Sequence, residues 1–140
     1  MIIRQITVKL ENTTGSVARI TALLASHGIN IIGFVATSDN KNGILRMIAA
    51  KHQLAKDILT NHNYSVTLEE VVCLKLKDVA GALNNALLML SQNGINLKYL
   101  YTISSRNGES IVVMDAPNVK ALINILLENG FKLLCFDEIA

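Results

Sequence analysis

The sequence predicts an α+β fold built from two copies of one small domain, residues 1–70 and 71–140. Segment 9–30 returns 66 residues later as segment 75–96, and seven of the 22 aligned residues are identical. A period of 66 residues exceeds the roughly 20 to 50 residues of solenoid repeats, so each copy should have its own core. The spacing of apolar residues then predicts the strands and helices of each copy.

Each copy opens with a strand and a helix. Ile6, Val8 and Leu10 alternate with polar residues, and this period of two is typical of a strand. Apolar residues then recur at helical spacing over residues 17–24, and Gly28 ends the pattern, as a glycine in the left-handed region commonly does. The second copy repeats these features at Val72, Leu74, Leu76, Leu83, Leu87, Leu90 and Gly94.

A hairpin, a second helix and a last strand complete each copy. Apolar runs over 29–35 and 44–50 flank a polar stretch with Gly43, which indicates a hairpin. A helix is expected over 54–61 and a strand over 64–69. The equivalent segments of the second copy are 95–103, 110–114, 119–129 and 131–137.

The order strand, helix, strand, strand, helix, strand is that of the ferredoxin-like βαββαβ fold. This fold is an antiparallel sheet with both helices on one face. Because crossover connections between parallel strands are right-handed, few other topologies are compatible with this order of elements. Only Glu69 and Glu70 separate the last strand of the first copy from the first strand of the second, so we expect rigidly coupled domains.

Composition and charge exclude several classes of protein. Residues 1–70 carry seven Lys or Arg against five Asp or Glu, and residues 71–140 carry six against six, so we expect no nucleic-acid partner. No apolar run approaches the roughly 18 residues of a membrane span, so no membrane partner is expected either. Cys73 and Cys135 lie in apolar runs, and no signal peptide opens the chain. We expect both to be reduced core residues of a cytoplasmic protein.

Groups for catalysis or metal binding are not suitably arranged. His27, His52 and His62 have no equivalents in the second copy, and no cysteine lies near them. Walker, G-x-G-x-x-G and G-x-S-x-G motifs are absent. We therefore predict no catalytic residue, no metal site and no cofactor, and we do not expect an enzyme.

One motif occurs in both copies: a strand, D-x-x-G, a helix, G-I-N-[IL] and a strand. Its pieces are Asn12-Thr13-Thr14-Gly15 with Gly28-Ile29-Asn30-Ile31, and Asp78-Val79-Ala80-Gly81 with Gly94-Ile95-Asn96-Leu97. The pattern resembles the ACT domain, a small regulatory module that binds amino acids in many metabolic enzymes. Two departures are Thr14 and Ala80 in place of the usual Pro, and Asn12 in place of the first Asp.

The turn glycines indicate an anion site without reference to the family. Gly15 and Gly81 precede helices whose free N–H groups and positive dipole end attract a carboxylate. An Asp carboxylate such as that of Asp78 suits the ammonium group of a zwitterion. In the related regulatory domain of phosphoglycerate dehydrogenase, positions matching Asn12 and Asn30 hold the ligand across an interface between two domains. The predicted ligand-binding residues are Asn12, Thr14, Gly15, Asn30, Ile31, Asp78, Ala80, Gly81, Asn96, Leu97 and Tyr99.

Structural roles are alternatives for these residues. Asn12 and Asp78 could cap a helix or fix the turn, and Asn30 and Asn96 could bond only local backbone. The glycines could be needed only for their backbone conformation.

Tyr99 and Tyr101 occupy the places of Gly33 and Val35, so the two copies differ there. The rings could line a ligand pocket or only pack on the strand.

The predicted function is that of a stand-alone regulatory protein that binds a small amino acid at an interface between ACT-like domains. A hydrophobic amino acid is favoured because the sequence places no Arg or extra carboxylate beside the motifs. These 140 residues leave no room for a catalytic domain, so the resemblance implies that the target is a separate enzyme or protein. The alternative is an interaction module that has lost its ligand.

A homodimer is also expected, because sheet edges tend to be paired and because Leu88 and Met89 supply spare apolar surface.

Overall fold

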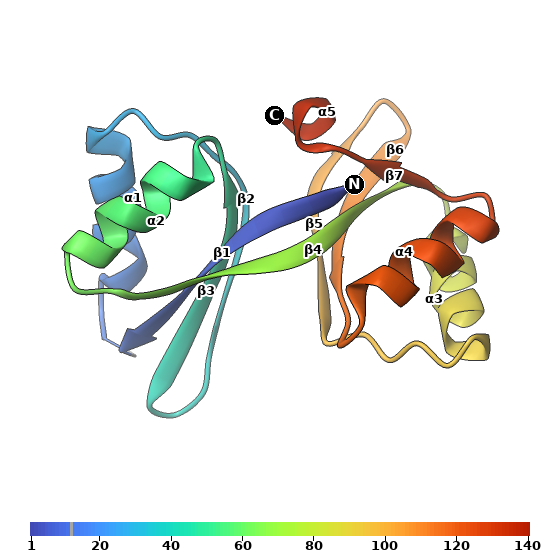
Figure 1. Cartoon of the computed structure of the whole chain (residues 1–140), viewed down its shortest axis with the longest axis horizontal. Coiled ribbons are helices and arrows are strands. Elements are labelled where there is room, and N and C mark those ends of the chain that lie inside the picture. The colour runs from blue at the N-terminus through green and yellow to red at the C-terminus, as the bar shows by residue number, and fades with distance from the viewer. Residues whose placement is uncertain (12) are drawn as a thin grey trace. The chain divides into compact units, whose positions relative to one another are not determined.

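The structure, a computed structural model, describes residues 1–11 and 13–140 (Figure 1). Its backbone divides into two compact units: a first unit of residues 4–69, and a second unit of residues 1–3 with 70–140. Each unit has the order βαββαβ, so the predicted α+β fold of two ferredoxin-like copies is confirmed. The domain limits 1–70 and 71–140 remain a prediction.

The first unit is an antiparallel sheet covered by two helices (Figure 1). Its strand order is β2-β3-β1-β4. Ile6 of β1, Met47 of β3, Ile20 of the first helix and Leu59 of the second belong to one buried cluster, so both helices cover the same face. The elements are β1 (Ile2–Glu11), α1 (Ser16–Ser26), β2 (Ile31–Ser38), β3 (Asn42–Ala49), α2 (His52–Asn61) and the first part of β4 (Ser65–Lys77).

The second unit repeats this arrangement. Its strands lie in the order β5-β6-β4, and β7 pairs with β4 through residues 73–75. Leu74, Leu90, Met114 and Leu122 share one buried cluster. The elements that follow β4 are α3 (Ala82–Gln92), β5 (Tyr99–Arg106), β6 (Glu109–Asp115), α4 (Val119–Glu128), β7 (Lys132–Leu134) and α5 (Phe136–Ile139). None of the helices in the described residues could cross a membrane.

One strand replaces two at the junction of the copies. The sequence predicts a break at Glu69 and Glu70, but β4 runs without interruption from Ser65 to Lys77. No Gly or Pro lies in this segment, and its Val and Thr residues favour the extended backbone. The expected break is therefore wrong.

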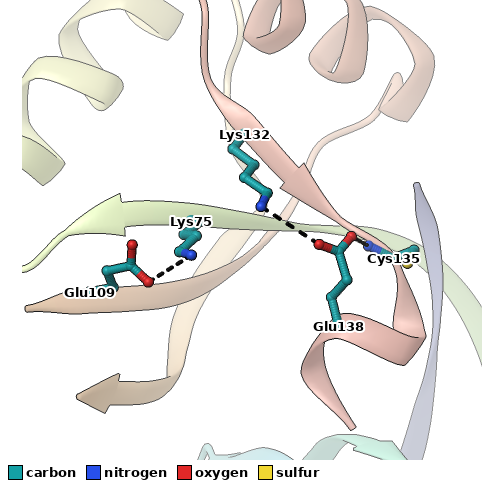
Figure 2. Close-up of polar contacts among 5 residues, drawn as sticks. All are labelled: Lys75, Glu109, Lys132, Cys135 and Glu138. Atoms are coloured by element: carbon teal, nitrogen blue, oxygen red, sulfur yellow. Dashed lines mark hydrogen bonds and ion pairs between the residues drawn. The ribbon is translucent and has the colours of Figure 1, made fainter. Parts of the chain in front are cut away.

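The C-terminal strand is shorter than predicted. β7 ends at Leu134, and residues 136–139 form α5, because the Glu138 carboxylate accepts a hydrogen bond from the Cys135 N–H (3.1 Å) and so caps this helix (Figure 2). The Lys132 ammonium lies 3.7 Å from the same carboxylate.

The two cysteines have different environments. Cys73 is buried in the middle of β4, and this burial raises the pKa of its thiol to about 12. Cys135 is exposed, because it follows the end of β7 and precedes α5. The expectation of a core position is wrong for Cys135.

Candidate ligand-binding site

The turn that leads into α1 is held by hydroxyl groups. Gly15, at the N-cap, has φ +82°, a conformation that disfavours side chains. The Ser16 hydroxyl lies 2.9 Å from the Glu11 carbonyl oxygen and 2.8 Å from that of Thr13, and it donates to them. Thr13 Oγ1 lies 2.8 Å from Ser16 Oγ. Asn12, a predicted ligand residue, lies outside the described residues.

The equivalent turn before α3 is fixed differently. Gly81 has φ +89° and is the N-cap. Oδ2 of Asp78 accepts a hydrogen bond from the Ser105 hydroxyl (2.7 Å), and the Asp78 N–H donates to the Gly108 carbonyl (2.8 Å). The alternative that Asp78 caps α3 is therefore wrong. Asp78 instead ties the turn to the β5–β6 hairpin.

Among the described residues, the first helical turns of α1 and α3 carry N–H groups without an acceptor. Because both N-caps are glycines, neither supplies a side-chain cap, whereas Asn118 caps α4 by accepting from the Ala121 N–H (3.0 Å). Within the described residues, the N–H groups of Val17 and Ala18 have no hydrogen-bond acceptor. Such N–H groups and the positive end of the helix dipole favour an anion.

A hollow of about 320 Å³ opens beside the start of α1. We name it the first-turn hollow. It is lined by Leu10, Glu11, Thr13, Gly15, Ser16, Val17, Ala18, Ala36, Thr37, Ser38 and Gly43. The first-turn N–H groups of α1, several hydroxyls and one carboxylate therefore surround a space large enough for a small ligand.

A groove lies at the same place in each copy, between the end of the first strand, the start of the first helix and the turn into the last strand. The first-copy groove, of about 520 Å³, is lined by Lys9, Leu10, Glu11, Thr13, Ser16, Arg19, Asn42, His62, Asn63, Tyr64 and Ser65. The second-copy groove, of about 600 Å³, is lined by Lys75, Leu76, Lys77, Val79, Ala80, Ala82, Asn85, Glu109, Gly130, Phe131 and Lys132. Most positions correspond, so the internal repeat extends to these grooves.

Salt bridges occupy part of the second-copy groove. The Lys75 ammonium lies 2.6 Å from Glu109 Oε2, and Lys132 contacts Glu138 (Figure 2). No group of His, Cys, Asp and Glu side chains suited to a metal ion occurs among the described residues.

Comparison with known proteins identifies the family. Residues 1–139 match the family model described as an ACT domain pair. The chain belongs to the ACT domain pair family. A search of curated proteins found no match.

Solved structures agree with this assignment. Protein BT0572 from Bacteroides thetaiotaomicron is 30% identical, over 96% of this chain and 92% of that chain, with a TM-score of 0.90. The regulatory subunit of aspartate kinase from Thermus thermophilus, in its ligand-free form, is 12% identical over 92% and 94% of the two chains, with a TM-score of 0.65. The Thermus flavus subunit is 11% identical over 90% and 92%, with a TM-score of 0.59. These two aspartate kinase subunits share the fold of this ACT domain pair.

The ACT motif residues do not all come together within one unit. Asn30 is exposed and its carbonyl accepts from the Ala50 N–H (3.0 Å), while Ile31 begins β2. Both lie beyond the C-terminal end of α1, whose 11 residues span about 16 Å. Gly15 lies at the other end of this helix. Asn96 and Leu97 are separated from Gly81 by α3 in the same way.

The remaining predicted residues of the ACT domain pair have varied surroundings. Thr14 is exposed, and Ala80 lines the second-copy groove. Leu97 packs against the core of the second unit. Tyr99 is half-buried on β5, where its ring stacks on that of Tyr101 with centroids 6.5 Å apart. A ligand-lining role for Tyr99 stays a prediction.

Arg19 was missed by sequence reasoning. Its guanidinium donates to the Thr14 carbonyl oxygen (3.3 Å), to Thr13 Oγ1 (3.3 Å) and to Ser16 Oγ (3.4 Å). The available signal was its position four residues after Gly15, because residues at this spacing lie on the same side of a helix. The premise that no Arg adjoins the ACT motifs is therefore wrong for the first copy.

Proposed function

We propose that this ACT domain pair is a regulatory protein that binds a free amino acid, catalyses no reaction and acts on a separate protein. The observation that carries the proposal is the uncapped first turn of α1, open to the first-turn hollow. A ligand carboxylate accepts hydrogen bonds from the N–H groups of Val17 and Ala18 there. The positive end of the helix dipole strengthens this contact.

The hollow also offers a partner for the ammonium group. Glu11, at the end of β1, lines the first-turn hollow with the hydroxyls of Thr13 and Ser16. An ammonium group donates to carboxylate and hydroxyl oxygens, and its bonds to a carboxylate are charge-assisted. The two ends of an amino acid thus have complementary groups beside the same turn.

A second ACT domain would complete the ligand contacts. Asn30 and Ile31 lie at the far end of α1, so they cannot contact a ligand held at Gly15 of their own copy. A ligand that joins the turn of one domain to the β2 start of another links its occupancy to assembly.

The edge strand β2 supports a homodimer. β2 pairs with β3 on one side and with no other strand among the described residues. Phe34 on this strand is 63% exposed, although its pairing partner Met47 is in the core. An exposed edge with a large apolar side chain is a favourable surface for pairing.

The test is thermal unfolding of the full chain in the presence of each of the twenty amino acids. A ligand at about 100 times its dissociation constant adds about 2.7 kcal/mol to the free energy of unfolding, which raises the midpoint by several degrees. Ala18→Glu places a carboxylate at the first turn of α1, where it stabilises the helix but repels the ligand carboxylate. We expect this variant to fold and to lose the shift.

The matched control is Asn84→Glu, because Asn84 is exposed at the equivalent position of α3. A reduced shift in both variants assigns a site to each copy, whereas loss of the shift only in Ala18→Glu assigns the site to the first copy. If no amino acid shifts the midpoint, the chain is an interaction module without a ligand and the proposal is wrong.

A further inference from the structure

The Arg19 guanidinium is fixed over the turn that precedes its own helix. Three hydrogen bonds of 3.3 to 3.4 Å join it to Thr13, Thr14 and Ser16. A Cβ atom on Gly15 would lie 3.2 Å from Nη1. The charged group therefore lies against the first-copy motif itself.

Carbonyl and hydroxyl oxygens are the partners of this guanidinium. None of the ion pairs among the described residues involves Arg19. A cation beside a helix N-terminus is electrostatically unfavourable, because the helix dipole is positive at that end. An anion bound here would interact favourably with both the guanidinium and the dipole.

The first-turn hollow and the first-copy groove flank the same turn, since Leu10, Glu11, Thr13 and Ser16 line both. The hollow contributes the first-turn residues Val17 and Ala18, whose N–H groups have no acceptor among the described residues, and the groove contributes the Arg19 side chain. A ligand of a few carbon atoms that reaches both spaces also lies beside Glu11, which lines each of them.

We propose that the first copy binds an acidic amino acid, aspartate or glutamate, and that Arg19 selects it. The inference rests on the proposed amino-acid binding and names its ligand class. The α-carboxylate accepts from the first turn of α1, the side-chain carboxylate accepts from Arg19, and the ammonium group donates to Glu11. A neutral amino acid leaves the Arg19 charge unmatched.

Lys9 reinforces the selection. Its side chain also lines the first-copy groove, so the groove holds two permanent cations, Lys9 and Arg19, against one carboxylate, that of Glu11. A ligand with two carboxylates and one ammonium group has the complementary charges. This complementarity disfavours basic amino acids, whose extra charge would face like charges.

The second copy keeps a lysine, Lys75, at the position of Lys9 but lacks the other three groups. Asn85 stands at the position of Arg19, Lys77 at that of Glu11 and Ala82 at that of Ser16. Lysines line both grooves, but a guanidinium beside the turn and a carboxylate at the end of the first strand occur only in the first copy, so we expect one such ligand per chain.

The experiment is isothermal titration of the full chain with L-aspartate, L-glutamate, L-asparagine, L-glutamine and L-leucine. An acidic ligand should bind about tenfold or more tightly than its own amide, the size expected for a charge-assisted hydrogen bond. Arg19→Gln should bring the acid and the amide to within about threefold of each other. Arg19→Lys should restore part of the preference, because the charge is kept while the paired donors are lost.

Arg106→Gln is the matched control, because it makes the same change at an exposed residue of the second unit. It should leave all affinities unchanged, and unfolding curves establish that each variant is folded. Preferential binding of neutral amino acids, or an unchanged acid preference in Arg19→Gln, overturns the inference but leaves the regulatory function standing. Absence of a thermal shift with every one of the twenty amino acids overturns both.

Discussion

The Ser105 hydroxyl donates a 2.7 Å hydrogen bond to Asp78, 27 residues earlier in the chain. This bond joins the turn before α3 to strand β5, so the second-copy turn is held by a different element from the first-copy turn, where Ser16 and Arg19 make the bonds. The two turns share a glycine and a motif position but not a supporting network.

Ser105→Ala should lower the free energy of unfolding by about 0.5 to 1 kcal/mol, because an exposed hydrogen bond contributes modestly. Urea denaturation measures this change. Asp78→Asn is the companion variant, since its amide oxygen still accepts from Ser105 and only the charge is lost. A larger loss in Asp78→Asn than in Ser105→Ala would show that the charge of Asp78, not this bond, supports the turn.

One thiol per chain should react rapidly with an aromatic disulfide reagent at pH 8. Cys135 is exposed, whereas Cys73 is buried and its pKa is raised to about 12, so its thiolate is scarce. Cys135→Ser should abolish the fast reaction, and denaturant should reveal the second thiol. Two fast thiols in the native chain would contradict this burial.

Cys73 should make the protein less stable as pH rises above about 9. The unfolded thiol ionises near pH 8.5, while the native thiol keeps its proton up to about pH 12, so the unfolded state binds fewer protons between these values. The expected slope is about 1.4 kcal/mol per pH unit, and no effect is expected at lower pH, where both states are protonated. The measurement compares the pH slopes of the native chain and Cys73→Ala, because the slopes are independent of the cavity that alanine leaves. Equal slopes would mean that Cys73 ionises in the folded state.

The cap of α5 should be lost on acidification. Hydrogen bonds from Cys135, with the charge of Lys132, lower the pKa of the Glu138 carboxyl, so the charged cap persists to pH values below the usual range of a glutamate and is lost as pH falls through the lowered pKa. The Cys135 amide resonance reports this step in NMR spectra. Glu138→Gln should remove the pH dependence of this resonance, and Asp137→Asn is the neighbouring control that should retain it.

Phe34→Lys should weaken a homodimer by about tenfold or more, because charge on an edge strand opposes pairing. Light scattering over a concentration series gives the mass. Leu88→Lys is the comparison, since Leu88 is 52% exposed on α3, whereas the other expected contact, Met89, packs on the core. A monomer mass for the native chain at high concentration would exclude the dimer.

The sequence predicts the order of the elements because its strongest signals are local. Gly28 and Gly94 end helices in left-handed conformations, and alternating residues such as Ile6 and Val8 pack in the core. The repeat also helps to assign the elements, because an ambiguous segment in one copy has a clearer equivalent in the other copy.

The wrong or missing predictions concern side-chain contacts between residues apart in the sequence, and segments that can form either a helix or a strand. The apolar residues around Cys135 resemble a strand, but the Glu138 side chain stabilises a helix start that apolar patterning does not report. In the sequence Arg19 is an ordinary helical residue. Its guanidinium contacts the Thr14 carbonyl oxygen only because of the three-dimensional arrangement of α1 and the preceding turn. Glu69 and Glu70 are predicted to separate two strands, yet charged residues are compatible with an extended backbone and the strand continues through them.

The uninterrupted strand β4 has a consequence for gene fragments of this protein. A cut anywhere between Ser65 and Lys77 leaves two polypeptides that each need part of the same strand. Complementary fragments that both contain residues 65–77 should fold where fragments split at residue 70 do not. The boundary between the two copies therefore lies inside a strand, and a single copy excised at that boundary would end in the middle of β4.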